Sequence, residues 1–582
     1  MTPPLKKLPI GIQTFREIIT EGYTYVDKTS HALAMAEAGK YYFLSRPRRF
    51  GKSLFLDTLK ELFEGSEDIF RGLAIHERWD WTRRHPVIRL DFAGGVVQSR
   101  AELDQAIREL LALNERRLGL TCEAKSLAGC FAELIIRAHE ASGQRVVVLV
   151  DEYDKPILDS IDQPARAAEL REGLKNLYSA MKAQDAHLQF VFMTGVTKFS
   201  KVNLFSGINQ LNDLTLHSRF ATVCGYTQTD LETTFGAHLA GVDWDQLKRW
   251  YNGYGFLGEP VYNPFDILLF INNDRQYRNY WFETGSPSFL IKLLQKGRTF
   301  LPDLERVEAS EEILDSFDIE RIDPVTLLFQ AGYLTIESTS WQRSRLLYRL
   351  RLPNQEVKMA LADHLLDGWI GTLPSRRDAW QDALYACLSQ GDVPGLIAAI
   401  RRLFAGIPWQ NFRNNDLSKA EGYFASVLYA FFASLNAEII PEDVSNHGQV
   451  DLTVKLADYI YVIEIKVRHP IGAGRSASGV GEGILLEGED GIRTRDEASF
   501  GPPVGDLSSL VPAAAPTTTP GESPAATNPA LAQIRARDYS AKYRGLPGRG
   551  LFELGLVFDR QDRTLVQADW QALFQAPSRP LS

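Results

Sequence analysis

Residues 41–56 read Tyr-Tyr-Phe-Leu-Ser-Arg-Pro-Arg-Arg-Phe-Gly-Lys-Ser-Leu-Phe-Leu. The apolar start predicts a buried strand, the basic segment up to Gly51 predicts a turn, and the apolar residues after it predict an amphipathic helix. A strand, a turn ending in Gly-Lys-Ser and a helix form a cradle for nucleotide phosphates, because backbone N–H groups and a helix N-terminus favour anions. This stretch therefore predicts a P-loop in an α/β fold.

The residue types of this turn fit the chemistry of a bound triphosphate. Gly51 lets the backbone approach the phosphates, Lys52 is expected to reach the β and γ phosphates, and Ser53 offers its hydroxyl to Mg²⁺. The full P-loop pattern has glycine at position 46, where this chain has Arg46. We expect Arg46 and Arg49 to add positive charge for the phosphates. The alternative interpretation of such a turn is a solvated basic loop.

Two later strands complete the expected nucleotide site. An apolar strand that begins at Val146 ends in the adjacent carboxylates Asp151 and Glu152. Asp151 is expected to hold the same Mg²⁺, directly or through water, and Glu152 to polarise the attacking water. A third apolar strand ends at Thr194, a candidate sensor of the γ phosphate between the two phosphate-contacting strands. Capping the next turn is the alternative role for Thr194.

Composition limits the class of protein. The 582 residues are enough for several domains, and 45% hydrophobic and 24% charged residues are ordinary for a soluble globular protein. The net charge of −9 argues against a wholly basic nucleic-acid coat. No apolar stretch approaches the ~20 residues that span a bilayer and no signal-peptide core is present, so a cytoplasmic protein without a membrane partner is expected. The cysteines lack metal-ligand spacing and are expected to be reduced thiols: Cys122, Cys130, Cys224 and Cys387.

The expected secondary structure changes twice after the first part of the chain. Strands and helices alternate from about residue 40 to 220, which predicts a doubly wound parallel sheet. Residues 226–294 are helical and rich in aromatics, which favours the core of a small helical unit over a ligand box. A helix and a two-stranded ribbon with a basic edge, within 322–352, are typical of a winged helix. Such a unit contacts DNA in some proteins and braces neighbouring domains in others.

A second group of charged residues lies near the C-terminus. Asp451 lies on one alternating strand, while Glu464 and Lys466 share a face of the next, because side chains alternate with a period of two. If the strands form a hairpin, Asp451 can reach Glu464. The two carboxylates would then hold Mg²⁺, and Lys466 would orient or help deprotonate the water that attacks a phosphodiester. Glu421, which opens an amphipathic helix, could add a carboxylate. The alternative is a surface salt bridge on a hairpin.

These motifs, in this order, resemble a bacterial and archaeal family with an N-terminal AAA-ATPase-like domain and a C-terminal PD-(D/E)XK nuclease-like domain. In that family the phosphate loop itself resembles Arg-Pro-Arg-Arg-Phe-Gly-Lys-Ser, without the first glycine. The resemblance is carried by residues 25–29, 45–53, 150–156, 194–197, 250–254, 262–265 and 352–357 and by the set of Glu421, Asp451, Glu464 and Lys466.

The resemblance implies ATP and Mg²⁺ as cofactors and nucleic acid as partner, with DNA favoured over RNA. It implies that Lys52, Ser53, Asp151 and Glu152 serve ATP, and that Glu421, Asp451, Glu464 and Lys466 serve the nuclease. Nucleases of this superfamily often follow the core with a helix bearing Gln and Tyr, and this matches Gln533 and Tyr539.

One departure from the family is a long insertion beside the second site. Residues 468–527 are rich in Gly, Ser, Pro, Ala and Thr and are expected to be disordered. The insertion either gates the nuclease site or marks a weakened nuclease. The expected domains are an ATPase-like P-loop domain (1–225), a helical lid (226–300), a winged-helix-like segment (301–375), a restriction-endonuclease-like α/β domain in two parts (376–467 and 528–582), and the insertion between them.

The sequence therefore predicts an ATP-hydrolysing protein coupled to a Mg²⁺-dependent nuclease. We expect ATP to change how the nuclease is presented, because no helicase-type motif series is present. The alternative is a regulatory or scaffolding protein whose C-terminal domain binds nucleic acid or a partner without cleaving. A third interpretation, a DNA-binding regulator built on the winged segment, requires basic side chains on one face of that segment. A homo-oligomer is compatible with this architecture.

Overall fold

The N-terminal part of the molecule is built on a five-stranded parallel sheet. The computed structural model describes residues 5–198, 210–281, 303–304, 306–315, 322–370, 374–407, 420–468, 528–546, 549–560 and 562–574. The strand order β2-β3-β4-β1-β5 places β4 between β1 and β3, and every neighbouring pair is parallel, which confirms the predicted sheet. The strands are β1 (Tyr41–Ser45), β2 (Val87–Asp91), β3 (Val146–Asp151), β4 (Leu188–Gly195) and β5 (Asn212–Asp213).

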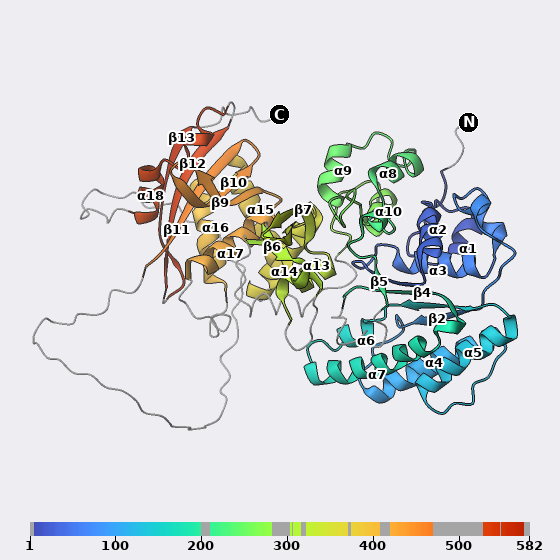
Figure 1. The fold of residues 1–582 in the computed structure, drawn as a ribbon. Helices are drawn as coiled ribbons and strands as arrows, with labels where there is room; N and C mark the ends of the chain where they lie inside the picture. The colour runs from blue at the N-terminus through green and yellow to red at the C-terminus, as the bar shows by residue number, and fades with distance from the viewer. Residues whose placement is uncertain are drawn as a thin grey trace, which may run out of the picture.

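Helices cover both faces of this sheet, with α1, α2 and α3 on one side and α4, α5 and α7 on the other (Figure 1). The valine-rich strand β3 is buried over all six residues, as expected for a strand enclosed by two helical layers. In α3 the repeated leucines face the core. The helices are α1 (Phe15–Thr20), α2 (Thr29–Ala38), α3 (Lys52–Phe63), α4 (Arg100–Leu118), α5 (Leu127–Ser142), α6 (Lys155–Leu158) and α7 (Pro164–Ala183).

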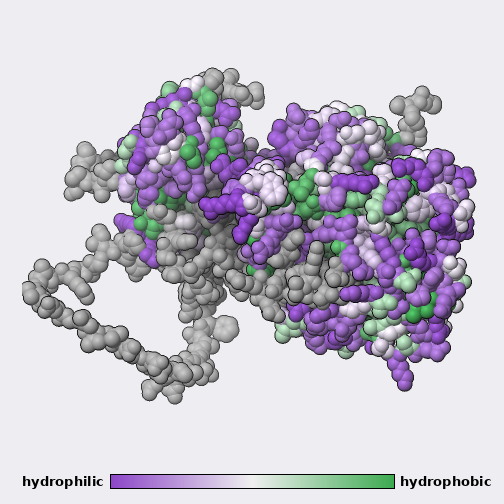
Figure 2. Space-filling model, in the orientation of Figure 1, coloured by the Kyte–Doolittle hydropathy of each residue, from purple (hydrophilic) through white to green (hydrophobic). Residues whose placement is uncertain are grey.

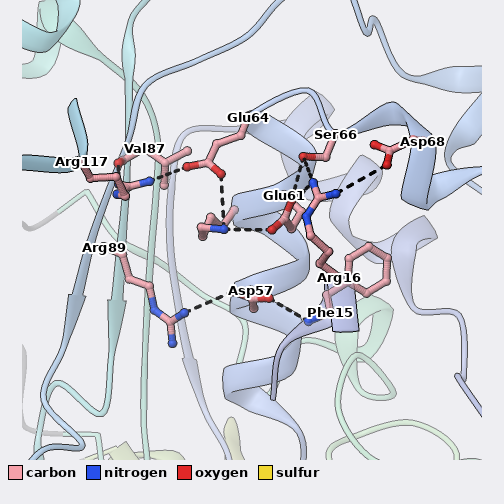
Figure 3. A network of polar contacts seen from close by, with 11 residues as sticks. Phe15, Arg16, Asp57, Glu61, Glu64, Ser66, Asp68, Val87, Arg89 and Arg117 are labelled. Atoms are coloured by element: carbon pink, nitrogen blue, oxygen red, sulfur yellow. Dashed lines mark hydrogen bonds and ion pairs between the residues drawn. The ribbon is translucent and has the colours of Figure 1, made fainter. Parts of the chain in front are cut away.

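A network of charged side chains holds the phosphate-loop helix α3 against its neighbours (Figure 3). The buried carboxylate of Asp57 accepts a hydrogen bond from the backbone N–H of Phe15 at 2.8 Å and pairs with Arg89 at 3.2 Å. One turn further on, Glu61 pairs with Arg16 at 2.7 Å. These contacts tie α3 both to α1 and to β2.

The helical segment after the sheet packs around a separate apolar cluster, which combines aromatic and aliphatic side chains and includes Val26 of the N-terminal segment. Tyr251 and Phe270 pack in it with Tyr277, as expected from the dense aromatics. Asn263 begins α10 by accepting a hydrogen bond from the N–H of Phe265 at 3.0 Å, with proline in the first turn. The helices are α8 (Gln228–Thr234), α9 (Trp244–Tyr251) and α10 (Pro264–Asn272).

The next segment combines short helices with a three-stranded antiparallel sheet of order β6-β8-β7. Asp323 caps α13 at its start and Gly332, with φ 90°, ends it. A helix followed by a two-stranded ribbon was expected, whereas the third strand, β6, was not. The elements are β6 (Val307–Ser310), α12 (Glu311–Asp315), α13 (Pro324–Ala331), β7 (Thr335–Gln342) and β8 (Arg345–Arg351).

The C-terminal part is a mixed sheet of order β13-β12-β11-β10-β9 (Figure 1). The predicted hairpin of β10 and β11 is present and antiparallel, and β12 adds to β11 in parallel. Residues 469–527, which make up nearly all of the expected insertion, lie outside the described residues. The elements are α14 (Gln355–Ile370), α15 (Pro374–Gln390), α16 (Val393–Ala405), α17 (Ala420–Ala433), β9 (Glu438–Ser445), β10 (Gly448–Leu456), β11 (Tyr459–Arg468), α18 (Pro529–Arg537), β12 (Gly550–Asp559) and β13 (Leu565–Phe574).

The surface seen in Figure 2 is mostly hydrophilic, with small scattered apolar patches. Among the described residues, none of the helices combines the length and the hydrophobicity needed to cross a bilayer.

Candidate functional site

In the predicted phosphate loop, backbone carbonyl groups bind the ammonium group of a lysine. Gly51 precedes α3 with φ 89° and ψ 18°, a left-handed conformation that glycine adopts without steric cost. The next residue, Lys52, is buried and turns its side chain back into the loop. Its Nζ donates hydrogen bonds to the carbonyl oxygens of Arg46 at 3.0 Å and Pro47 at 3.1 Å.

The loop and the acidic strand end meet at Ser53 and Asp151, whose side chains interact closely. Asp151 is the last residue of β3 and is 1% exposed. Burial and the nearby carboxylates of Asp91 and Glu152 raise the pKa of Asp151 to about 6. The hydrogen bond from Ser53 and the charge of Lys52 oppose this rise. A hydroxyl and a carboxylate side by side are oxygen donors of the kind that Mg²⁺ prefers.

Glu152 follows in an unusual backbone conformation. Its φ is 50°, and its N–H donates to Oδ1 of Asp151 at 3.0 Å. Residues other than glycine are uncommon in this region, and such positions cluster at functional sites. The backbone of Glu152 is therefore turned sharply where β3 ends, and the half-buried side chain is carried beside Asp151.

Asp154 is a residue of this site to which the sequence analysis gave no role. It is fully buried and accepts hydrogen bonds from the N–H of Val196 at 3.0 Å and from both the N–H and the hydroxyl of Thr197 at 2.6 Å. Burial, with the charge of Glu152, raises the pKa of Asp154 to about 6. Asp154 thus fixes the end of β4 to the turn after β3. The sequence signal for Asp154 was the third carboxylate of Asp-Glu-Tyr-Asp.

Two other candidates of the nucleotide site contact protein groups. Thr194 is fully buried, and its hydroxyl donates to the carbonyl oxygen of Leu44 on β1 at 2.9 Å. Arg49 is exposed, has φ 71°, and lies with its guanidinium 4.5 Å from the ring centroid of Phe265 in α10. Thr194 therefore joins β4 to β1, and Arg49 links the loop to the helical segment.

Arg46 differs from its expected role in binding phosphate. Its guanidinium is 1% exposed and donates to the carbonyl oxygens of Ser45, Thr215 and Phe220 at 2.9 to 3.2 Å. It also lies 3.8 Å from the ring centroid of Phe256. Burial lowers the pKa of Arg46 to about 10. Because the guanidinium binds backbone carbonyls inside the protein, Arg46 stabilises the loop and does not present its charge to a bound phosphate.

The predicted nuclease carboxylates lie opposite each other on the β10–β11 hairpin. The strand pairing ends with Leu452 and Ile463, and Asp451 and Glu464 are the next residues on the two strands. At that point Oδ2 of Asp451 accepts a hydrogen bond from the backbone N–H of Ile465 at 2.7 Å. The carboxylate of Asp451 therefore reaches across to β11 beside Glu464.

Glu464 is buried, and its two carboxylate oxygens have different surroundings. Its Oε1 lies 3.0 Å from Nζ of Lys466, while Oε2 is buried and has no hydrogen-bond partner among the residues that the structure describes. Burial and the charge of Asp451 raise the pKa of Glu464 to about 7, against the opposing effect of Lys466. An unpaired buried carboxylate oxygen beside a second carboxylate fits a divalent cation. Glu421 lies in the first turn of α17, and its side chain is outside the described part of the chain.

Helix α18 covers the face of the sheet that carries Glu464. Val462 shares that face, two residues before Glu464, and packs with Leu531 of α18 in one apolar cluster. Nε2 of Gln533 in α18 donates to the hydroxyl of Tyr539, just after the helix, at 3.3 Å. The Gln and Tyr that follow the insertion are thus hydrogen-bonded to each other on the helical layer above the carboxylates.

A second polar cluster on this sheet was not predicted from the sequence. Asp443 of β9 is buried and accepts hydrogen bonds from the hydroxyls of Thr453 at 2.7 Å and Tyr543 at 2.6 Å, and it pairs with Lys542. These contacts fix the segment after α18 to β9. No sequence pattern predicts them, because Asp443 and Tyr543 are far apart in the chain.

The basic edge expected on the ribbon is present but partly paired. Arg345, Arg349 and Arg351 are exposed along β8. Two of them contact Glu337 of β7: Arg349 at 3.1 Å and Arg351 at 3.6 Å. Trp341, near the turn of the ribbon, is 74% exposed. The ribbon therefore presents a mixed surface with a basic and aromatic tip.

Comparisons with known proteins agree with this arrangement. A family model described as "Predicted AAA-ATPase" matches residues 9–205, and one described as "PD-(D/E)XK nuclease superfamily" matches residues 419–484. The chain is 50% identical over 475 residues to "Uncharacterized protein in vnfD 5'region" of Azotobacter chroococcum mcd 1, across 81% of this chain and 91% of that protein. The protein therefore belongs to the family that joins an N-terminal predicted AAA-ATPase domain to a C-terminal domain of the PD-(D/E)XK nuclease superfamily.

Proposed function

We propose that this protein hydrolyses ATP at the phosphate loop and cleaves nucleic acid, DNA in particular, at its C-terminal sheet, with Mg²⁺ at each site. The observation that carries the proposal is the buried carboxylate of Glu464 beside Asp451. One of its oxygens is paired with Lys466, and the other has no hydrogen-bond partner within the described part of the chain. A charge held at such a position is costly unless a cation meets it.

At the nucleotide site, Lys52 is the cation for the β and γ phosphates. In the absence of phosphate its Nζ binds two loop carbonyls, and phosphate oxygens would compete with these for the same ammonium. Ser53 and Asp151 would hold Mg²⁺, which neutralises charge on the phosphate oxygens when bound. Glu152 would accept a proton from the attacking water. Asp154 acts through the backbone at 196–197 and keeps the end of β4 in place.

At the nuclease site, Asp451 and Glu464 would hold Mg²⁺, and Lys466 would orient the attacking water and stabilise charge on the phosphate. The ammonium of Lys466 lies 3.0 Å from Glu464, so both groups face the same region. Gln533 and Glu421 are proposed to act with this set, Gln533 from α18 and Glu421 from α17. A metal-held water and a nearby ammonium are the parts that phosphodiester hydrolysis needs.

The proposed coupling between the two sites is supported by α14, which contacts both parts of the molecule. At its start, Oε1 of Glu356 accepts hydrogen bonds from the N–H groups of Tyr280 at 2.5 Å and Trp281 at 2.9 Å. Burial, together with the neighbouring carboxylate of Glu356, raises the pKa of Asp266 in α10 well above its usual range. The start of α14 is therefore joined to the helical segment by the contacts of Glu356.

Further along α14, Lys358 places its Nζ 5.5 Å from the ring centroid of Tyr429 in α17. Leu361 and Leu365 line a small cavity between α14 and α17 with Tyr429 and Ala430. Helix α14 thus runs from the helical segment, which contacts Arg49 of the phosphate loop through Phe265, to the helix that opens the nuclease domain. Movement of the loop on binding nucleotide can reach the nuclease by this path.

Cleavage of plasmid and single-stranded DNA by the full chain with Mg²⁺ and ATP tests the nuclease. Asp451→Ala is expected to abolish cleavage and leave ATP hydrolysis nearly intact, whereas Lys52→Ala is expected to abolish ATP hydrolysis. Glu438→Ala removes an exposed carboxylate of the same sheet and should cleave as the parent does. Cleavage by Asp451→Ala equal to that of the parent would overturn the nuclease proposal. DNA binding without cleavage by the parent would favour the scaffolding alternative.

The coupling is tested with Lys358→Ala. Without ATP this variant should cleave at the parent's rate, and its ATP hydrolysis should be unchanged, because Lys358 belongs to neither site. The change in cleavage rate that ATP produces in the parent should be reduced or absent. An unaltered ATP response would exclude the contact between Lys358 and Tyr429 as part of the path.

A further inference from the structure

Two of the four cysteines lie together with a glutamate, although the cysteines lack metal-ligand spacing in the sequence. Glu115 lies near the end of α4, Cys122 in the connection to α5, and Cys130 in the first turns of α5. One ligand atom from each lies within 4.8 Å of the other two. All three residues are half-buried, so the cluster is reachable from solvent.

We propose that Glu115, Cys122 and Cys130 form a binding site for Zn²⁺, separate from both proposed Mg²⁺ sites. Thiolates are soft ligands that suit Zn²⁺ and disfavour Mg²⁺, and a carboxylate completes a three-ligand set that Zn²⁺ commonly uses with a water. Tetrahedral bonds of about 2.3 Å to sulfur require the two sulfur atoms to lie about 3.8 Å apart. The observed cluster is compatible with this spacing after small side-chain shifts.

The three ligand residues already contact one another through side-chain and backbone groups. The thiol of Cys122 donates to the carbonyl oxygen of Cys130 at 3.3 Å, and the backbone N–H of Cys122 donates to Oε1 of Glu115 at 2.5 Å. Burial and the neighbouring Glu115 raise the pKa of both thiols. A divalent cation bound here would offset the charge of Glu115 and displace the thiol protons.

The connection that carries Cys122 is held in place by contacts outside the cluster. Glu133 accepts hydrogen bonds from the N–H groups of Glu123 and Ala124, each at 2.8 Å. Arg137 donates to the carbonyl oxygen of Thr121 at 2.6 Å and pairs with Glu123 at 2.8 Å. These contacts order the backbone around the ligands before a metal binds, which lowers the entropic cost of metal binding.

The site would join the ends of two helices on one face of the ATPase sheet. Helices α4 and α5 both pack against α7 on that face (Figure 1). A bond from the metal to each helix and to their connection would stabilise this layer against local opening. Neither proposed Mg²⁺ site includes any of the three ligands, so the zinc site can be tested independently of the proposed function.

Titration with Co²⁺, which reports thiolate coordination by absorption, tests the site. The untagged full chain is reduced, stripped of metal with a chelator and titrated. A thiolate-to-metal absorption band is expected to saturate at one equivalent, and Zn²⁺ should remove it. Cys122→Ser and Cys130→Ser should lose the band, whereas Cys387→Ser, which changes another half-buried thiol, should keep it.

Glu115→Gln tests the third proposed ligand, because it removes the charge and keeps the shape of the side chain and the acceptor oxygen. Its dissociation constant for Zn²⁺ is expected to rise at least about tenfold, since even loss of an outer-sphere partner has that effect. Circular dichroism checks that each variant is folded. Absence of the band in the reduced parent, or its persistence in Cys122→Ser, would overturn the proposal. A Cys122–Cys130 disulfide found by mass spectrometry, with no band after reduction, would identify the pair as a thiol couple instead.

Discussion

The hydroxyl of Ser53 lies close enough to the carboxylate of Asp151 to lower its pKa, although the two residues lie on different elements far apart in the chain. Ser53 is the second residue of α3, and Asp151 ends β3. Strand β4 lies between β1 and β3, so the contact spans a central strand of the sheet. It brings the two halves of the proposed nucleotide site to one place.

The pKa of Asp151 predicts how ATP hydrolysis depends on pH. This pKa is raised to about 6, and only the ionised carboxylate can hold Mg²⁺. As the pH falls through about 6, protons compete with the metal, so the Mg²⁺ concentration for half-maximal ATP hydrolysis should rise. Steady-state ATPase assays at several pH values and Mg²⁺ concentrations measure this. Asp151→Asn should lose activity at every pH, and a Mg²⁺ requirement that does not change between pH 8 and 5 would contradict the role of Asp151.

Glu464→Gln should stabilise the protein at pH 8 without divalent metal while abolishing cleavage. The pKa of Glu464 is raised to about 7, so the folded protein holds this proton more tightly than the unfolded chain. Stability contributed by the protonated group is present below the unfolded value and is lost as the pH rises through about 7. Gln resembles the protonated form and avoids this loss. The free energy of unfolding of Glu464→Gln at pH 8 should therefore exceed that of the parent by about 1–2 kcal/mol after allowance for solvent screening.

Thermal unfolding at pH 8 and pH 5 measures the effect of Glu464→Gln. The variant should unfold at a higher temperature than the parent at pH 8, and the difference should shrink at pH 5. Mg²⁺ should raise the unfolding temperature of the parent more than that of the variant, because ligand binding to the folded state is stabilising. Glu438→Gln serves as the control on the same sheet. A variant that is less stable than the parent at pH 8 would indicate that Glu464 is already neutralised within the protein.

The sequence was informative where the structure is local. The phosphate loop, the β10–β11 hairpin and the parallel sheet follow from patterns of neighbouring residues. The burial of Arg46 could not be predicted, because its acceptors Thr215 and Phe220 come from a distant loop. Asp443 likewise meets Tyr543 only through the folded sheet. Contacts of this kind depend on tertiary packing and produce no recognisable pattern of residue spacing in a single sequence.

Asp57→Ala should destabilise the ATPase part of the molecule by about 2–4 kcal/mol. The substitution leaves the backbone N–H of Phe15 without its acceptor and removes one partner of Arg89 in a buried setting. Chemical denaturation followed by circular dichroism measures it. Asp68→Ala removes an exposed carboxylate from the same network (Figure 3) and should cost no more than about 1 kcal/mol. Equal effects of the two substitutions would show that burial of Asp57 is not what matters.

Gly195→Ala should lower ATP hydrolysis by disturbing the end of β4. A Cβ at this position would lie 2.3 Å from Oδ1 of Asp154 and 2.6 Å from the ring of Tyr153, both of which are buried. Relief of this clash requires Asp154 to move from the backbone N–H groups that it binds, and the turn beside Glu152 moves with it. A tenfold or larger fall in kcat is expected, since misplacement of catalytic groups by about 1 Å has an effect on the order of a hundredfold. Gly94→Ala is the matched control, because a Cβ there has open space in a loop after β2. Steady-state kinetics with both variants decide the matter: full activity in Gly195→Ala would mean that the contact between Asp154 and the end of β4 has no part in positioning the site.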